Sequence, residues 1–268
     1  ISIHDPHATH IQLEKALVER FGLRAAVVAA QTNGLPDELL RKRIGQTAAR
    51  YLEGILRDGD VVGMGWGRTL CEMVDALKNT ETKTRIEVIP LIGGLGQIDP
   101  SFQVNDLARR LSDTFDGSWY PCFAPAILPD RKVGESLKGT NDLRQIIDRW
   151  DDLDIALIGI GNSAFDSDFE VLFAKYLEPN MKERLRASRV AGDICMRFFS
   201  AEGDPYTGWA AEIMSITLEQ IRHTSTVIGI AGGRKKTEAV LGAIRGGYLK
   251  ILVTDEVTAK ILLEAKDA

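Results

Sequence analysis

Residues 61–69, with the sequence VVGMGWGRT, decide the fold class. The run that begins at Val61 is apolar and β-branched, which is typical of a buried strand, and the glycines that follow it mark a turn. Beyond Thr69, apolar residues recur at helical spacing as far as about Leu77. A buried strand that ends in glycine and leads into a helix is the unit from which parallel α/β sheets are built.

The same unit recurs along most of the chain. Apolar runs predict strands at 24–30, 61–64, 86–92, 119–123, 155–160, 227–231 and 250–254. Helical periodicity predicts helices at 11–21, about 36–56, 68–77, 105–115, 142–150, about 234–245 and 257–265. We therefore predict one α/β domain over residues 1–268, with a Rossmann-like, mostly parallel sheet and helices on both faces.

One stretch, residues 166–222, interrupts this alternation. It contains a predicted helix that runs to about residue 185, then an apolar segment at 193–199 and a polar turn at 201–205. We interpret the stretch as an excursion from the sheet that returns to form part of a binding site.

Composition and charge argue against several classes of function for this chain. Lys and Arg number 33 and Asp and Glu 38, a net charge of -5, which argues against a nucleic-acid-binding surface on this chain. Three scattered cysteines fit a reduced cytoplasmic protein better than a disulfide framework or a zinc site. We find no apolar run long enough to cross a membrane, so we expect a cytoplasmic location and no membrane partner.

Four predicted strands end in glycine, and this is the main pointer to a binding site. In open parallel sheets, ligands bind outside the carboxyl ends of the strands, where glycines allow close approach to the backbone. Arg68 and Thr69 add a cation and a hydroxyl donor at a predicted helix start, which favours an anionic ligand. The glycines concerned are Gly65 with Gly67, Gly93 with Gly94, Gly159 with Gly161, and Gly232 with Gly233.

Two further segments carry charges that point to the same ligand. The cations at 234–236 lie at a second predicted helix start, where positive charge is unfavourable, so a bound anion would offset them. A solvated surface cluster explains them equally well. Asp193 precedes an apolar segment, where it could bind sugar hydroxyls or act as a base, although Asp residues also commonly cap turns. Asp255 and Glu256 are interpreted as a helix cap with first-turn charge.

Known cofactor motifs do not fit this sequence. The glycines at 63–67 lack the third-glycine spacing and the downstream acidic residue of the dinucleotide fingerprint, and the segment 232–237 lacks Walker A spacing. The clustered His4, His7 and His10 are not interpreted as a metal site. We therefore predict no cofactor, no metal and no catalytic residue.

The ordered set of motifs resembles the sugar-binding effector domain of the SorC family of bacterial transcriptional regulators, which is often grouped with DeoR-type repressors. The matching stretches are VVGMGWGRTL at 61–70, LIGG at 91–94, DIALIGIG at 154–161, AGDIC at 191–195, AGGRKK at 231–236 and LVTDEVTA at 252–259. Each stretch is weak alone, but they follow the family's order and cover nearly the whole chain. The domain is similar to the fold of ribose-phosphate and glucosamine-phosphate isomerases.

The resemblance implies an effector-sensing function. In the family, a sugar or sugar phosphate binds at the strand ends and changes how a homodimer or homotetramer holds its operator. DNA contact there is made through an N-terminal helix-turn-helix domain, which we expect to be absent here, with residues 1–10 as the remnant of the linker to it.

The resemblance also assigns roles to the effector-binding residues. Carried over by position, Gly65, Gly67, Arg68 and Thr69 hold the anionic end, while Gly93 and Gly94 form a wall. Asp193 binds hydroxyls, Lys236 completes the contacts, and Gly161, Gly232 and Gly233 line the same strand ends. Some members that bind a sugar bisphosphate carry Arg before the paired glycines. Ile92 stands there in this chain, which argues against a second phosphate pocket.

Two other functions remain as alternatives. A sugar-phosphate isomerase on the same fold would use Asp193 as base and Lys236 to polarise the carbonyl. A dinucleotide-dependent dehydrogenase rests only on the glycines at 63–67. We rank the effector sensor first.

Overall fold

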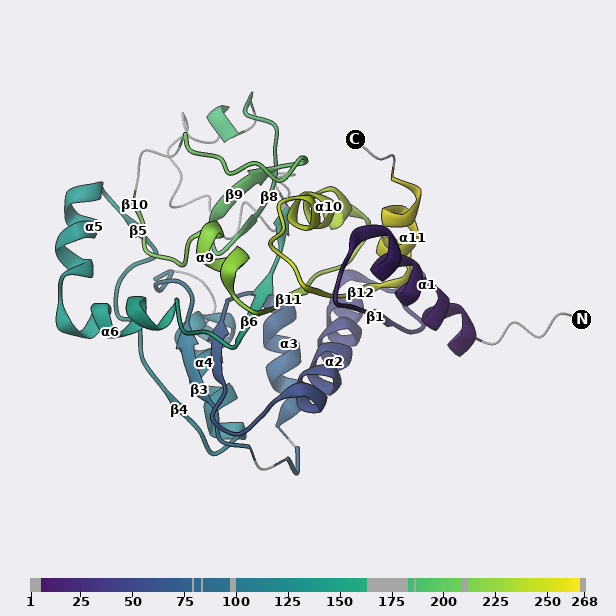
Figure 1. The fold of residues 1–268 in the computed structure, drawn as a ribbon, viewed down its shortest axis with the longest axis horizontal. Helices are drawn as coiled ribbons and strands as arrows, with labels where there is room; N and C mark the ends of the chain where they lie inside the picture. The colour runs from purple at the N-terminus through teal and green to yellow at the C-terminus, as the bar shows by residue number, and fades with distance from the viewer. Residues whose placement is uncertain are drawn as a thin grey trace, which may run out of the picture.

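Seven parallel strands form the central sheet, in the order β1-β12-β11-β6-β2-β3-β4 (Figure 1). The computed structural model describes residues 6–78, 80–82, 84–96, 100–162, 183–185, 187–208 and 212–265. The strands of this sheet are β1 (Ala25–Ala29), β2 (Val61–Met64), β3 (Glu87–Pro90), β4 (Ser118–Trp119), β6 (Ile155–Gly159), β11 (Thr226–Ile230) and β12 (Ile251–Asp255). The predicted α/β class with a mostly parallel sheet is confirmed.

Two smaller antiparallel sheets and the helices complete the described residues. One small sheet pairs β5 (Ile127–Leu128) with β10 (Glu212–Ile213), and the other joins β7 (Gly161–Asn162), β8 (Val190–Ile194) and β9 (Arg197–Ser200). The helices are α1 (Pro6–Phe21), α2 (Asp37–Ile55), α3 (Arg68–Leu77), α4 (Val104–Thr114), α5 (Arg131–Lys138), α6 (Asn141–Arg149), α9 (Leu218–His223), α10 (Thr237–Arg245) and α11 (Glu256–Glu264), with short 3-10 turns η1 (Pro100–Phe102) and η2 (Arg234–Lys236).

Helices cover both faces of the central sheet, because strand residues alternate between two buried clusters. Ile251 and Val253 of β12 pack in the cluster that contains buried residues of α2, α3 and α4. Leu252, between them, packs in the cluster that contains buried residues of α1, α6, α10 and α11. The strand is buried on both sides, which explains why its sequence is almost continuously apolar.

The end of β12 ties helix α1 to the rest of the fold. Glu256, the first residue of α11, accepts a hydrogen bond from the Gln31 N–H at 3.1 Å, and its Oε1 lies 2.6 Å from His10 Nε2 on α1. Its own N–H donates to Thr32 Oγ1 at 3.3 Å. One acidic side chain therefore links α1, the segment after β1 and the start of α11.

Several predicted boundaries differ from the structure. Helix α1 begins at Pro6, before the predicted residue 11, and β4 covers only Ser118–Trp119 instead of 119–123. Helix α5 was not predicted because residues 129–140 are largely polar, and β5 was not predicted because it is only two residues long. Most of the helix predicted before residue 185 lies outside the described residues.

The close crossing of α2 and α3 depends on Gly45. A Cβ added there would lie 2.6 Å from Glu72 Cβ and 2.7 Å from the Met73 backbone nitrogen, so the helices would have to move apart. We predict that Gly45→Ala lowers the free energy of unfolding by about 1–3 kcal/mol, as overpacking does. Urea unfolding followed by circular dichroism measures this change.

Gly54 provides the matched control in the same helix. A Cβ added there meets nothing within 4 Å, so Gly54→Ala should raise the free energy of unfolding by about 0.5–1 kcal/mol through helix propensity alone. Equal stability of Gly45→Ala and the wild type would contradict the close crossing.

Candidate functional site

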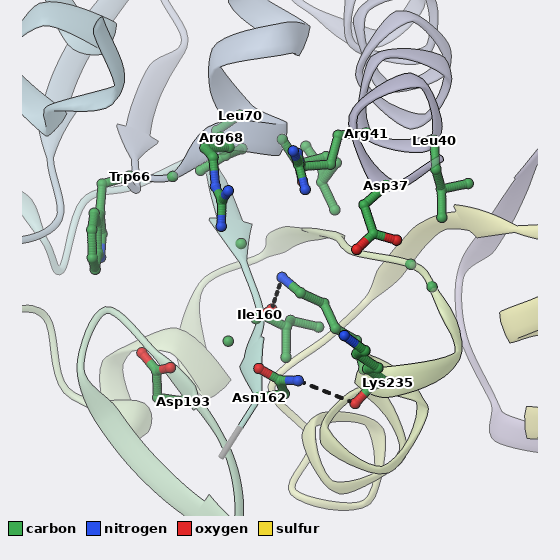
Figure 2. Close-up of a pocket in the computed structure, with 18 of the residues that line it drawn as sticks. Asp37, Leu40, Arg41, Trp66, Arg68, Leu70, Ile160, Asn162, Asp193 and Lys235 are labelled. Carbon is green, nitrogen blue, oxygen red and sulfur yellow. Dashed lines mark hydrogen bonds between the residues drawn. The ribbon is translucent and has the colours of Figure 1, made fainter. Parts of the chain in front are cut away.

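A cavity of about 350 Å³ lies at the carboxyl ends of β2, β6 and β11 (Figure 2). Its walls come from the start of α3, the η2 turn before α10, the first two turns of α2, and the β7–β8 pair. This is the position at which open parallel sheets bind ligands. The sequence-predicted residues that line it are Gly67, Arg68, Thr69, Gly161, Asp193, Gly232, Gly233 and Lys236.

Three sequence-predicted residues are not part of this lining. The Gly65 N–H donates to Leu157 O at 2.9 Å, a bond that joins the end of β2 to β6. Gly93 and Gly94 donate their N–H groups to Met214 O and Ala124 O, each at 2.8 Å. A Cβ on Gly93 would lie 2.5 Å from Ala124 O, so close backbone packing explains why glycine stands there.

Two loops form the edge of the cavity, and each contains a glycine with a positive φ angle. Gly67 precedes α3 with φ 124°, and Gly233 precedes η2 with φ 96°, conformations that residues with a Cβ rarely adopt. The Gly233 N–H is fixed by Asp255 Oδ2 at 2.6 Å and by Thr258 Oγ1 at 2.9 Å. Asp255 also caps α11 by accepting from the N–H groups of Val257 and Thr258, so the predicted capping role is confirmed.

Cationic side chains occupy the α2, α3 and η2 sides of the cavity. Figure 2 shows Arg68 and Arg41 pointing into the cavity from the helices above it, with Lys235 at its other edge. Lys236 Nζ donates to Ile160 O at 2.8 Å, and Asn162 Nδ2 donates to Lys235 O at 3.4 Å. The Lys236 ammonium is therefore held at the end of β6, and the backbone of the η2 turn is joined to β7.

Asp193 supplies a carboxyl on the opposite side of the cavity (Figure 2). It lies on β8 across from Gly161, whose added Cβ would fall 1.9 Å from Asp193 Oδ1, so only glycine leaves room for this carboxyl. Burial raises the pKa of Asp193 to about 6, and the Met196 N–H and the charge of Lys236 act in the opposite direction. The Met196 N–H donates to Oδ2 at 3.0 Å.

Part of the lining was not predicted from the sequence. Asp37, Leu40 and Arg41 come from the start of α2, a segment in which the sequence pattern indicates only an apolar helix. The available signal was topological: α2 follows β1, and its start therefore lies at the same edge of the sheet as the other strand ends. The other missed residues are Trp66, Leu70, Ile160, Asn162, Cys195 and Ile230, whereas Gly159, Arg234 and Lys235 belong to the strand end and the cation cluster that pointed to the site.

The cysteines give no activated thiol. Burial raises the pKa of Cys195, which lines the cavity, and the nearby Asp193 charge adds to that effect. Burial also raises the pKa of Cys71 on α3 and that of Cys122. Within the described residues no group of His, Cys, Asp and Glu side chains could hold a metal ion. A search of those residues also finds no helix that is long and apolar enough to cross a membrane.

Known proteins share this chain's sequence and fold. Residues 5–264 match the Sugar-bind family model, which describes a sugar-binding domain. The sorbitol operon regulator of Klebsiella pneumoniae is 31% identical over 266 residues, which cover 98% of this chain and 84% of the relative. The transcriptional regulator LsrR of Enterobacter sp. (strain 638) is 27% identical over 265 residues, covering 98% of this chain and 79% of that protein.

A solved structure matches the whole architecture. The crystal structure of the full-length sorbitol operon regulator SorC from Klebsiella pneumoniae superposes with a TM-score of 0.88 at 30% identity, covering 98% of this chain and 83% of that chain. The family resemblance found in the sequence motifs is therefore confirmed. The chain belongs to the sugar-binding domain family of SorC-type transcriptional regulators.

Proposed function

We propose that this chain is the effector sensor of a cytoplasmic transcriptional regulator, and that the cavity at the strand ends binds a sugar or sugar phosphate without converting it. The observation that carries this proposal is the distribution of charged side chains around the cavity. Arg41 and Arg68 enter it from the starts of α2 and α3, and the buried Asp193 lies on the opposite side. Lys236 also lines the cavity, and its charge acts on Asp193. An anionic sugar needs cations at one end and a hydroxyl acceptor at the other.

The site roles assigned from the resemblance remain part of this proposal. The loop at 67–69 and Lys236 hold the anionic end, and Asp193 accepts hydrogen bonds from sugar hydroxyls. Gly161, Gly232 and Gly233 leave room for the ligand beside the backbone. Gly65, Gly93 and Gly94 support the site from outside its lining, through the backbone hydrogen bonds described above.

Regulation would follow from linkage between the effector and operator DNA. An effector that binds one arrangement of a homodimer or homotetramer more tightly shifts the regulator toward that arrangement, and DNA affinity changes by the same free energy. The net charge of -5 supports DNA contact through another part of the regulator. The names of the relatives, which include a sorbitol operon regulator, make hexitols and their phosphates reasonable first ligands to test.

A ligand panel tests the sensor proposal. Thermal melts would be run with free sugars, hexitols, sugar phosphates and nicotinamide cofactors. A ligand at a hundredfold excess over its Kd should stabilise the fold by about 2.7 kcal/mol, which is several degrees in Tm for a domain of this size. The sensor proposal expects a shift with a sugar or sugar phosphate, whereas a shift with a nicotinamide cofactor alone would favour a dehydrogenase.

Turnover separates the sensor from the isomerase alternative. Ribose 5-phosphate and glucosamine 6-phosphate would be incubated with the protein and followed by NMR. We expect no conversion of either compound. Conversion that disappears in Asp193→Asn would establish an enzyme and overturn the proposal of binding without reaction.

Two substitutions test the site assignment. We predict that Asp193→Asn and Lys236→Met each weaken binding of the panel's best ligand roughly tenfold to hundredfold, because each removes a charged hydrogen-bonding partner worth about 1.5–3 kcal/mol. Isothermal titration calorimetry measures the change. Asp148→Asn and Lys132→Met, on exposed positions of α6 and α5, are the matched controls and should bind as the wild type does. If both site variants bind the ligand with wild-type affinity, neither Asp193 nor Lys236 contributes to ligand binding.

The raised pKa of Asp193 predicts a pH-dependent stability. In the unfolded chain this carboxyl ionises near pH 3.8, but in the folded protein it ionises near pH 6. The unfolded state therefore loses its proton first, and the stability of the fold falls as pH rises through this window and then levels off. The difference corresponds to about 3 kcal/mol at neutral pH.

Asp193→Asn isolates this contribution. The amide oxygen can still accept from the Met196 N–H, but the buried charge is gone. We expect the variant to match the wild type at pH values below about 4 and to exceed its stability above about pH 6, both measured by urea unfolding. A constant difference between the two proteins across that range would show that Asp193 does not titrate in this way.

A further inference from the structure

A second cavity, of about 360 Å³, lies beside the turn that joins β8 to β9. It is lined by 196–198, 205–207, 212–213, 217–219 and 222, and we call it the hairpin cavity. Among the described residues, it shares none of its lining with the cavity at the strand ends. The proposed sugar-binding function makes no use of it.

The turn between β8 and β9 lies between the two cavities. Cys195 lines the cavity at the strand ends, and the next residue, Met196, lines the hairpin cavity. Both residues are buried, and both have a left-handed backbone, with φ 49° and 62°, which residues with a Cβ rarely adopt. The Met196 N–H is held by Asp193 Oδ2 at 3.0 Å. Strained positions of this kind cluster at ligand-binding sites, and here a cavity lies on each side of the turn.

Arg197 brings a fixed positive charge to the hairpin cavity. Its Nη2 donates to Ile213 O at 2.9 Å and to Ser215 O at 3.0 Å, and its Nε donates to Ile216 O at 3.3 Å. Three carbonyls of one segment therefore hold the guanidinium plane in place. Burial lowers the pKa of Arg197, because the charged form is poorly solvated there. Its Nη1 has no hydrogen-bond partner in the part of the chain that the structure describes.

The other charged groups of the hairpin cavity have ionic partners. Glu212 is in contact with Lys138 Nζ, and Glu219 Oε2 lies 3.7 Å from Arg222 Nη1. The Glu212 charge acts through space on Arg197 and partly offsets the effect of burial on its pKa. Within the described residues, however, no carboxylate forms an ion pair with Arg197. One positive charge of the hairpin cavity is therefore left without an ionic partner.

Apolar side chains form much of the remaining wall of the hairpin cavity. Met196, Phe198, Ile213 and Leu218 all line it and are all buried. Binding sites for small molecules typically combine apolar walls with a few fixed polar groups that orient the ligand. A guanidinium group pairs well with a planar carboxylate, and one negative charge is enough to balance the charge of Arg197.

We propose that the hairpin cavity is a second ligand site of this chain, and that its ligand is a small organic monocarboxylate. The carboxylate accepts a hydrogen bond from Arg197 Nη1, and the apolar part of the molecule packs against Phe198 and Leu218. This site is separate from the proposed sugar site and goes beyond the proposed function.

Benzoate is the probe for this experiment. Benzyl alcohol and benzylamine are the comparisons, because they carry the same ring with a neutral or a positive group. Each compound would be titrated at constant ionic strength into the wild type, Arg197→Met and Arg245→Met, with binding measured by calorimetry and folding verified by circular dichroism. Arg245 is the matched control: it is half-buried and donates to Ala201 O at 3.2 Å, but it is not part of the cavity lining.

The proposal expects benzoate to bind the wild type and Arg245→Met alike. Arg197→Met should bind benzoate at least about tenfold more weakly, because a charged hydrogen-bonding partner is lost. Benzyl alcohol and benzylamine should bind the wild type at least about tenfold more weakly than benzoate does, and the weak binding of benzyl alcohol should be the same in Arg197→Met. A purely structural role of Arg197 would affect all three compounds equally.

Amide chemical shifts in the wild type locate the bound probe, and they keep the proposal testable if Arg197→Met does not fold. Benzoate should shift the amide signals of Phe198 and Leu218, which line the hairpin cavity, and leave those of Gly67 and Gly233 unchanged.

Three results would overturn the proposal. The first is no binding of benzoate to the wild type, and the second is a shift of the Gly67 and Gly233 signals alone. The third is equal binding of benzoate and benzyl alcohol, which would indicate an apolar void in which Arg197 has no part. The sugar panel tests the sensor separately, so either proposal can fail while the other stands.

Discussion

The cavity depends on one buried carboxylate, that of Asp255. It is almost completely buried at the end of β12, yet each of its oxygens accepts hydrogen bonds: from the Val257 and Thr258 N–H groups on one side, and from Gly233 N–H and Thr258 Oγ1 on the other. Four donors satisfy a charge that would otherwise be very unfavourable in the interior. Without it, the Gly233 loop and the start of α11 would both lose their anchor.

The central fold could be predicted from sequence because its signals are strong and local. Strands such as β11 and β12 are buried on both sides, and their continuous apolar runs leave few alternatives. The short elements β5 and α5 lack such signals, and the strand predicted at 119–123 is reduced to β4 at Ser118–Trp119. The two unpredicted elements are two and eight residues long, and α5 buries only Gly134, so tertiary contacts rather than local pattern determine them.

The loops at 67–69 and 232–236 could be predicted because glycine and charge stand there at strand ends. Asp193 was predicted from its place before an apolar segment and from the family resemblance. The strand-end pattern also selected Gly93 and Gly94, because a glycine required by backbone packing looks the same in sequence as one that faces a ligand. The start of α2 was missed for the opposite reason: Asp37 and Arg41 are polar residues four positions apart, a pattern typical of any solvated helix surface.

Asp255 and Glu256 are neighbours in the chain, but they serve different sides of the molecule. The first holds the glycine loop at the cavity edge, and the second holds helix α1 through His10. A single peptide bond therefore separates the cavity edge from the docking point of the N-terminal helix. The contact of Asp255 with Gly233 and the contact of Glu256 with His10 cannot move far independently of each other, because the two acidic residues are adjacent in the chain. The edge of the cavity and helix α1 are therefore directly connected through the backbone.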